Sequence, residues 1–246
     1  GTSLVLSLDK TVQHYLEKGL SQAVKDNDAA SAYGIVMDVN TGAVLAMATM
    51  PDYDLNNPAV ITDKATLKEL KKIKDKEAYA KAYNEKVYMM WRNKVVSDTY
   101  EPGSTFKTFT AAACFEAGLL EASDTFYCPG YRVVEDRRIR CHKAGGHGSE
   151  TFVEGIQNSC NPVFMELGAR LGVERFYQYF KKFGVMEKTG VDLPGEAGTI
   201  IHKQENVGPV ELATMSFGQS FQITPLQLAT MVSTIVNGGK RVTPHL

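Results

Sequence analysis

The chain has 246 residues, of which 43% are hydrophobic and 22% charged, a composition ordinary for a folded globular protein. Its formal net charge of -1 gives no electrostatic reason to expect a nucleic acid as partner. No run of about 20 apolar residues occurs, so the sequence predicts neither a membrane-spanning helix nor a signal peptide. The length suits one large domain, and we predict a single domain over residues 1–246.

The N-terminal part of the chain predicts strands and one helix. The apolar run Leu4–Leu8 indicates a strand, and Asp9 the N-cap of a helix that ends near residue 25. Residues 32–39 and 43–48 are rich in side chains that favour strands, and the Asn-Thr-Gly turn between them predicts a hairpin. These strands require sheet partners from elsewhere in the protein.

A stretch dense in Lys, Glu and Ala lies between residues 65 and 86. Mixed charge of this kind is typical of a solvated helical face, and we predict a charged helical insertion at about residues 60–95 without catalytic groups. Helix dominates the second half of the chain. Further helices are predicted at residues 105–117, 152–157, 163–171, 173–183, 209–215 and 225–236.

The strongest chemical signal is the segment Tyr100-Glu-Pro-Gly-Ser-Thr-Phe-Lys107. Its Pro and Gly break the chain, and a helix is predicted to begin at or next to Ser104. Residues at i and i+3 share a helix face, so we expect Lys107 to reach the Ser104 hydroxyl as a general base. A lysine serves in this role when burial lowers its pKa, and the apolar run after Lys107 provides a buried setting. The segment therefore indicates a serine nucleophile for acyl transfer.

A second candidate segment is Ser159-Cys160-Asn161, between two predicted helices. The Ser159 hydroxyl can pass a proton towards a leaving group, and the Asn161 amide can hold a substrate amide. If the segment is extended, its side chains alternate, so Ser159 and Asn161 face one way and Cys160 the other. A Ser-x-Asn string is also a common helix cap, so its chemical meaning depends on the Ser-x-x-Lys segment upstream.

Four segments together resemble the transpeptidase domain of class B penicillin-binding proteins, in particular its elongation-type and sporulation-type members. They are residues 100–107, 159–161, 189–196 (Thr-Gly-Val-Asp-Leu-Pro-Gly-Glu) and 218–229 (Gly-Gln-Ser-Phe-Gln-Ile-Thr-Pro-Leu-Gln-Leu-Ala). Residues 37–48 are similar to the N-terminal hairpin of that family. The likeness covers nearly the whole chain.

The resemblance implies an α/β fold of the serine β-lactamase type, in which helices flank a sheet. It implies that Ser104 is the acylated nucleophile and Lys107 its base, with Ser159 and Asn161 as the pair of the second motif. The implied reaction is D-Ala-D-Ala transpeptidation, which cross-links peptidoglycan stem peptides. β-Lactam antibiotics would acylate the same serine.

The resemblance also implies where such a protein acts. We expect the extracytoplasmic face of the cell membrane, with a membrane anchor outside this chain. Cell-wall synthesis proteins are expected as partners, and no nucleic acid. No organic cofactor is expected.

The third motif of the family, Lys-Thr-Gly, is spelled by Lys188-Thr189-Gly190. This string precedes Val-Asp-Leu-Pro-Gly-Glu, which the family places on a loop before the active-site strand, so we expect it not to be the catalytic motif. The family's own Lys-Thr-Gly strand and the other C-terminal strands are expected beyond Leu246. That strand supplies one donor of the oxyanion hole. Because loss of one such donor costs about 10²–10³ in rate, the chain as given is predicted to be inactive.

Three cysteines and two histidines cluster between residues 128 and 160. Thiolates and imidazoles are zinc ligands, and a closed set of four is structural rather than catalytic. The resemblance assigns the zinc ligands to Cys128, Cys141, His147 and Cys160. His142 is the reserve ligand. A zinc ion there would brace the second motif from behind, through Cys160.

Two other states of these cysteines stay open. Cys128 and Cys141 could form a disulfide in an oxidising exterior, or the thiols could be unlinked. Cys114 lies in the apolar helix after Lys107 and is predicted to be a core residue.

Two other functions fit parts of the sequence. A class D β-lactamase or a β-lactam sensor domain also uses Ser-Thr-Phe-Lys, although the Lys/Glu-rich insertion and the segment that begins at Ile223 speak against it. A non-catalytic, zinc-braced cell-wall scaffold would keep the cysteines without using Ser104. Repeated hydrolysis of penicillin would identify the β-lactamase, and a mass shift on Ser104 would exclude the scaffold.

Overall fold

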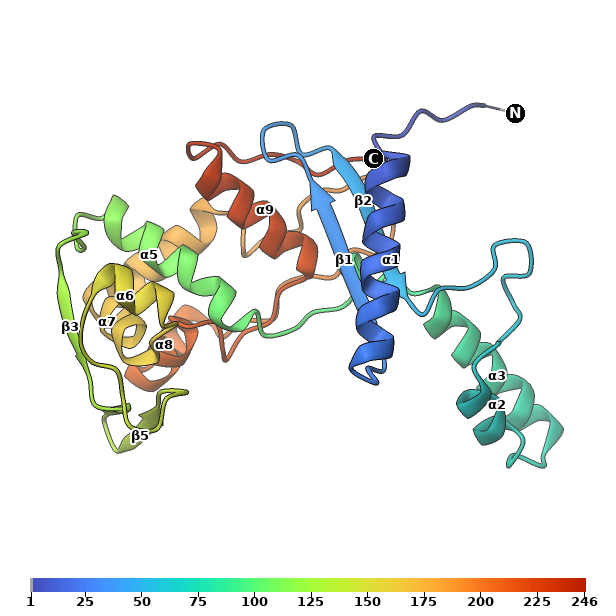
Figure 1. Ribbon diagram of the computed structural model, residues 1–246, viewed down its shortest axis with the longest axis horizontal. Coiled ribbons are helices and arrows are strands. Elements are labelled where there is room, and N and C mark those ends of the chain that lie inside the picture. The colour runs from blue at the N-terminus through green and yellow to red at the C-terminus, as the bar shows by residue number, and fades with distance from the viewer. Residues whose placement is uncertain (1) are drawn as a thin grey trace.

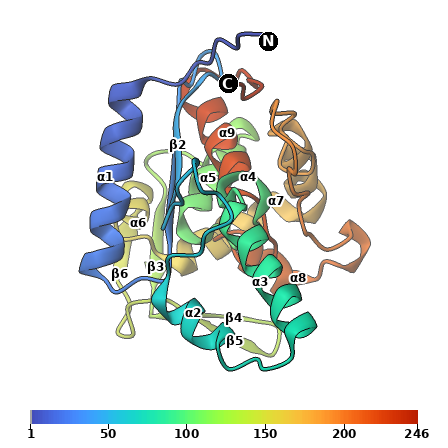
Figure 2. The same ribbon diagram turned by 90° about the vertical axis from the view of Figure 1, so that its right-hand side faces the viewer.

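The computed structural model describes residues 2–246 and shows a two-stranded hairpin held between helices (Figure 1). Helix α1 (Lys10–Asp26) lies on one face of this hairpin, which consists of β1 (Ala32–Met37) and β2 (Val44–Met50). Helices α4 (Lys94–Ser97) and α9 (Pro225–Val236) lie on the other face (Figure 2). The predicted α/β class is confirmed. Within the described residues no helix combines the length and the apolar character that crossing a membrane requires.

Side chains join α1 to the hairpin at specific points. The Asp9 carboxylate accepts hydrogen bonds from the first backbone N–H groups of α1, as predicted for its N-cap. The Gln13 side chain donates to Met47 O at 3.0 Å and accepts from Met47 N at 2.9 Å, so α1 satisfies backbone groups of β2 that β1 does not reach. These hydrogen bonds therefore fix the position of the hairpin relative to α1.

The predicted strand at Leu4–Leu8 is wrong. Residues 2–9 form no strand, and the side chains of Leu4 and Val5 are exposed. The Ser7 hydroxyl donates to Val44 O at 2.7 Å, but no backbone ladder forms. A strand exists only where a neighbouring strand takes up its backbone groups, and an apolar run alone does not provide one.

The charged segment is helical, as predicted. It forms α2 (Lys64–Leu70) and α3 (Lys76–Trp91), which project from the rest of the chain in Figure 1 and lie in front of it in Figure 2. A small core of its own, made by Ile61, Leu70 and Val87, holds these helices together.

The main core lies among the helices of the second half. These are α5 (Lys107–Glu116), α6 (Phe152–Gln157), α7 (Asn161–Lys182) and α8 (Pro209–Met215). The predicted bounds of α6, α8 and α9 agree with the structure. The two helices predicted at 163–171 and 173–183 form the single element α7, interrupted at Gly172, which has φ 73° and ψ 162°.

Stacked phenylalanines fill the space between α5 and α7. The ring of Phe106 lies 4.6 Å from that of Phe109 and 5.5 Å from that of Phe180. These rings are buried and offset or edge-on, the arrangements that aromatic pairs prefer. The buried Phe106 ring therefore fixes the turn that precedes α5, and the candidate nucleophile Ser104 lies in this turn.

Four short strands cover one side of the helical region and were not predicted. Strand β3 (Thr125–Cys128) pairs with β6 (Gly148–Thr151), and β4 (Tyr131–Val134) pairs with β5 (Arg137–Arg140), all antiparallel. They connect α5 to α6. Cys128 ends β3, and Cys141, His142 and His147 lie on the loop between β5 and β6.

Candidate active site

Ser104 lies in a tight turn that leads into helix α5. Residues Gly103–Phe106 form a 3₁₀ turn, and α5 begins at Lys107 rather than at the predicted residue 105. The hydroxyl of Thr105 donates to Pro102 O at 2.7 Å and holds the turn closed. Ser104 is exposed, whereas Phe106 beside it is fully buried. The turn therefore presents the Ser104 hydroxyl to solvent on an anchored backbone.

A second backbone segment packs directly against this turn. Gly103 N donates to Gly218 O at 2.9 Å, and the backbones of Tyr100 and Ile223 exchange hydrogen bonds. Gly218 has φ 87°, and a Cβ atom there would lie 2.0 Å from Gly103 O. Glycine is needed at residue 218 because both the positive φ and the close backbone approach exclude a side chain.

Replacing Gly218 with alanine is expected to destabilise the fold by at least about 2 kcal/mol, because the new Cβ atom combines left-handed strain with an overlap of backbone atoms. The Ser104 turn should move, so labelling by a fluorescent penicillin should also slow. Thermal unfolding and labelling rate measure the two effects. Gly238, which also has positive φ but nothing within 4 Å of an added Cβ, is the matched control. If Gly218→Ala behaves like Gly238→Ala, the close packing does not matter.

Lys107 connects the two candidate segments. Its Nζ donates to Ser159 O at 2.6 Å, to Ser159 Oγ at 3.0 Å and to Asn161 Oδ1 at 2.8 Å. The side chain is buried, with the residue only 4% exposed. Of the four candidate catalytic residues, the structure brings these three together. Lys107 Nζ makes no hydrogen bond to the Ser104 hydroxyl, so the expected contact between the two side chains is not made. Only the backbone N–H of Lys107 donates to Ser104 O, within the turn.

The environment of Lys107 changes its proton affinity. Burial lowers the pKa of Lys107 from 10.5 to about 8, while the nearby thiol groups of Cys141 and Cys160 act in the opposite direction. About a tenth of the amine is then neutral at pH 7, and this neutral form is the one that can act as a general base. The three oxygen acceptors hold the ammonium form in a fixed position.

The second candidate segment differs in backbone shape from the extended form that we expected. Ser159 follows the C-cap of α6 and has φ 49°, Cys160 is the N-cap of α7, and Asn161 begins that helix. The side-chain directions nevertheless diverge as expected. Ser159 and Asn161 contact Lys107, while Cys160 is fully buried in the cysteine and histidine cluster. Asn161 Nδ2 also donates to Arg140 O at 3.2 Å.

The donor set of the cluster suits a closed zinc site. One ligand atom from each of four residues lies within 4.8 Å of the other three, and all four side chains are buried or nearly so. The edges of a tetrahedron with 2.3 Å bonds are about 3.8 Å, so small movements would bring the four donors onto one ion. The residues are Cys128, Cys141, His147 and Cys160. Burial is the main factor that raises the pKa of Cys160, and a bound cation would be needed to hold its thiolate.

The cysteines form no disulfide, and Cys114 and His142 lie outside the set of four donors. All four cysteines are free thiols, so the structure contains no Cys128–Cys141 disulfide. Cys114 is fully buried in α5 and donates to Leu167 O at 3.4 Å, in keeping with its prediction as a core residue. His142 is exposed, and its Nδ1 lies 3.8 Å from Cys141 Sγ, outside the set of four.

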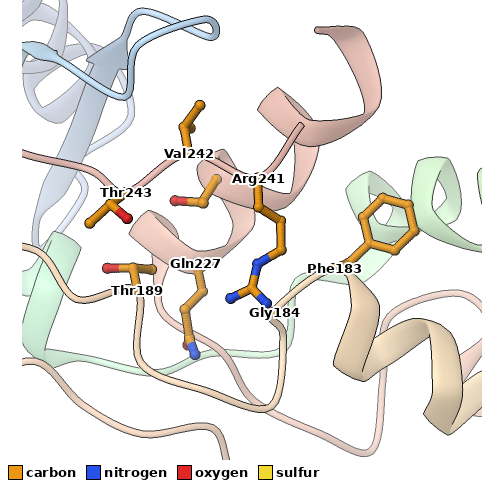
Figure 3. Close-up of a pocket in the computed structure, with 8 residues that line it drawn as sticks. Phe183, Gly184, Thr189, Gln227, Arg241, Val242 and Thr243 are labelled. Atoms are coloured by element: carbon orange, nitrogen blue, oxygen red, sulfur yellow. The ribbon is translucent and has the colours of Figure 1, made fainter. Parts of the chain in front are cut away.

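Lys188-Thr189-Gly190 lies on the loop between α7 and α8. Thr189 N and Gly190 N both donate to the Glu196 carboxylate, and Lys188 is exposed. Thr189 lines a pocket of about 280 Å³ together with Gln227 and Arg241 (Figure 3). None of the four candidate catalytic residues lines this pocket. The hydrogen bonds of the string thus shape a loop and do not involve the Ser104 turn.

Comparisons with known proteins agree with this arrangement. Residues 32–246 match the penicillin-binding protein transpeptidase domain family. The chain is 39% identical to stage V sporulation protein D of Bacillus subtilis, over 100% of this chain and 34% of that protein. It is 31% identical to the probable peptidoglycan D,D-transpeptidase FtsI of Caulobacter vibrioides, over 96% of this chain and 35% of that protein. The chain thus spans about a third of the length of these curated relatives.

Solved structures share the fold. A putative peptidoglycan glycosyltransferase from Atopobium parvulum superposes with a TM-score of 0.81 at 28% identity, covering 100% of this chain and 52% of that chain. The transpeptidase domain of penicillin-binding protein 3 from Burkholderia pseudomallei superposes with a TM-score of 0.77 at 22% identity, covering 100% of this chain and 62% of that chain. The fold predicted from the resemblance is therefore confirmed.

Proposed function

This chain belongs to the penicillin-binding protein transpeptidase family, and we propose that it carries the acylation site of a peptidoglycan D,D-transpeptidase. The observation that carries the proposal is the contact of buried Lys107 with both Ser159 and Asn161, one turn beyond exposed Ser104. The similarity to the probable peptidoglycan D,D-transpeptidase FtsI of Caulobacter vibrioides supports the reaction class.

In the proposed reaction Ser104 Oγ attacks the carbonyl carbon between the two terminal D-alanines of a stem peptide. Lys107, in its neutral form, takes the hydroxyl proton, and the bond between serine and the acyl group forms. The amide C–N bond then breaks, and the Ser159 hydroxyl, 3.0 Å from Lys107 Nζ, passes the proton to the leaving D-alanine nitrogen. An amine from a second stem peptide then attacks the ester carbonyl and gives a proton to Lys107. The C–O bond to Ser104 breaks as Lys107 returns a proton to Ser104 Oγ, so that the new amide forms the cross-link and the serine hydroxyl is restored.

Asn161 has a second role in this proposal. Its Oδ1 accepts from Lys107 at 2.8 Å, and its Nδ2 lies on the Arg140 side of the segment. The amide can exchange the Arg140 contact for the peptide carbonyl of a bound substrate. A β-lactam would react at the same serine, because its strained amide takes the place of the substrate amide. Ring opening releases no leaving group, so the acyl group stays attached to Ser104.

We also propose that the cluster of Cys128, Cys141, His147 and Cys160 holds a structural zinc ion, because its buried donors are close enough for one tetrahedral ion. Zinc in such a site supplies folding free energy and takes no part in the reaction. The substrates of this proposal, peptidoglycan stem peptides, lie outside the cytoplasmic membrane. We therefore place the domain on the extracytoplasmic face, where cell-wall synthesis proteins are its expected partners.

The proposed function is tested with the full-length protein and a peptide that ends in D-Ala-D-Ala. Release of D-alanine, together with transfer of the acyl group to an added D-amino acid, is expected for the wild type. Ser104→Ala should show neither reaction while keeping the wild-type melting temperature. D-Alanine release that persists in Ser104→Ala would overturn the proposal, and rapid repeated hydrolysis of penicillin would favour a β-lactamase.

The acylation rate should depend on pH through Lys107. Since its pKa is lowered to about 8, the neutral base becomes more abundant as pH rises through that value. We expect the second-order rate of penicillin acylation to rise about tenfold per pH unit below pH 8 and to level off above it. Rates measured at constant ionic strength across this range check the expectation. A flat profile between about pH 6 and 9 would contradict a lysine base with this pKa.

A further inference from the structure

Glu150 is a buried carboxylate that the proposed reaction does not use. It lies on β6, opposite Phe126 on β3, and its side chain is 2% exposed. Its Oε1 is the one buried side-chain oxygen or nitrogen among residues 2–246 that lacks a hydrogen-bond partner. A buried carboxylate without full pairing is costly, so the site is incomplete as it stands.

The two oxygens of Glu150 face two different neighbours. Oε1 lies 3.9 Å from His147 Nδ1, and Oε2 accepts a hydrogen bond from Asn158 Nδ2 at 3.2 Å. Asn158 directly precedes Ser159, which contacts Lys107. Glu150 thus lies between the cysteine and histidine cluster and the second segment of the active site.

Glu150 is outside the inner set of donors. The four residues whose ligand atoms lie within 4.8 Å of one another do not include it. Its place is next to the ligands His147 and Cys160. A histidine bound to a metal through one ring nitrogen keeps an N–H on the other, and a carboxylate is the usual acceptor for that N–H.

We propose that Glu150 is a positioning residue that couples the metal site to the active site. With metal held by His147 Nε2, Oε1 accepts the Nδ1–H of His147, the ring nitrogen that lies 3.9 Å from it, which completes the pairing of this carboxylate. Oε2 holds Asn158 and with it the left-handed backbone at Ser159, φ 49°. This proposal rests on the zinc site proposed above and names a residue that no ligand motif in the sequence identified.

The two contacts of Glu150, from Oε1 to His147 and from Oε2 to Asn158, can be tested separately by mutation. Glu150→Gln weakens the acceptor for His147 and disturbs the contact with Asn158 in a side chain of nearly unchanged shape. Asn158→Ala removes only the hydrogen bond from Asn158 to Glu150 Oε2, at a position with an ordinary helical φ of −79°. Asp136→Asn removes one carboxylate from the exposed turn between β4 and β5, where the side chain is 85% exposed, and serves as the matched control.

The first measurement is the affinity of the chain for zinc, by competition with a chromophoric chelator. Glu150→Gln should bind zinc about 10- to 100-fold more weakly, the range found for changes of this outer-shell kind. Asn158→Ala and Asp136→Asn should stay within about threefold of wild type. Nitrogen-15 spectra of the zinc-bound wild type should show one His147 ring nitrogen on the metal and the other carrying a hydrogen-bonded proton.

The second measurement distinguishes coupling from a merely structural role. Without metal, the melting temperature of Glu150→Gln should equal or exceed that of wild type, since the change removes an incompletely paired buried charge. In the zinc-loaded full-length protein, Glu150→Gln and Asn158→Ala should both slow penicillin acylation by about tenfold, since small shifts of a catalytic group cost this much or more.

Four outcomes would overturn the proposal. Zinc affinity of Glu150→Gln within threefold of wild type removes the link to His147, and an equal loss of melting temperature with and without zinc shows a structural role only. A wild-type chain that binds no zinc overturns this inference and the proposed zinc site together, but leaves the acylation proposal intact. Wild-type protein that binds zinc and is not acylated by penicillin removes the coupling and the proposed function, but not the metal site.

Discussion

Lys107→Ala is expected to reduce the rate of acylation by penicillin by roughly 10²–10⁴-fold, the contribution of a well-placed general base. Lys107 is the buried amine that contacts Ser159 and Asn161, and its lowered pKa of about 8 makes it available as a base. The substitution also removes a buried charge, so the domain should stay folded. A time course of fluorescent penicillin labelling of the full-length protein measures the rate.

Lys188→Ala is the control for this change. Lys188 begins the Lys-Thr-Gly string, but it is exposed on a loop that hydrogen-bonds to Glu196. Its removal should leave labelling unchanged. If Lys188→Ala slowed labelling as much as Lys107→Ala, or if Lys107→Ala stayed within tenfold of wild type, the assignment of the base would be wrong.

Loss of the metal is expected to have the second large effect. Cys160→Ser should abolish stoichiometric zinc and lower the melting temperature by roughly 10 °C, because metal binding in such a site is folding free energy. The Cys160 backbone lies between Ser159 and Asn161, so acylation should slow as well, by about 10²-fold if the segment shifts by about 1 Å. Metal analysis, thermal unfolding and labelling with and without a chelator measure these effects.

Cys114→Ser is the matched control for the metal. Cys114 is also a fully buried thiol, but it lies in α5 and donates to Leu167 O outside the cluster. A serine there can make the same hydrogen bond, and zinc content should stay at one per chain. Less than stoichiometric zinc in carefully purified wild-type protein would end the metal proposal, as would a melting temperature that chelation does not change.

Several helices could be predicted from the sequence because their ends carry local signals. Thr151 and Glu154 form a capping box at the start of α6, and Thr224 with Gln227 forms another at the start of α9. Pro209 begins α8. Such signals act between neighbours in the chain and need no knowledge of the fold.

Strand pairing could not be predicted in the same way. Leu4–Leu8 looked like a strand but has no ladder in the structure. Conversely, β5 contains three arginines in four residues and did not look like a strand, yet β4 pairs with it along its whole length. Whether a segment becomes a strand depends on the presence of a partner strand, whether near or far in sequence, and this outweighs the segment's own composition.

The candidate site shows the same division. Its motifs named Ser104, Lys107, Ser159 and Asn161, but the expected contact was from Lys107 to Ser104 within one helical turn. The structure instead directs Lys107 to a hydroxyl 52 residues away. Glu150 was missed because a glutamate beside polar residues reads as exposed, and only the pairing of β3 with β6 buries it.

The most direct test of the central claim is the mass of the full-length protein after incubation with benzylpenicillin. We expect an increase equal to one whole penicillin molecule, because ring opening loses no atoms, and peptide mapping should place the adduct on Ser104. The adduct should persist for many minutes and should be absent in Ser104→Ala. An unchanged mass, or an adduct on any other residue, would contradict the account.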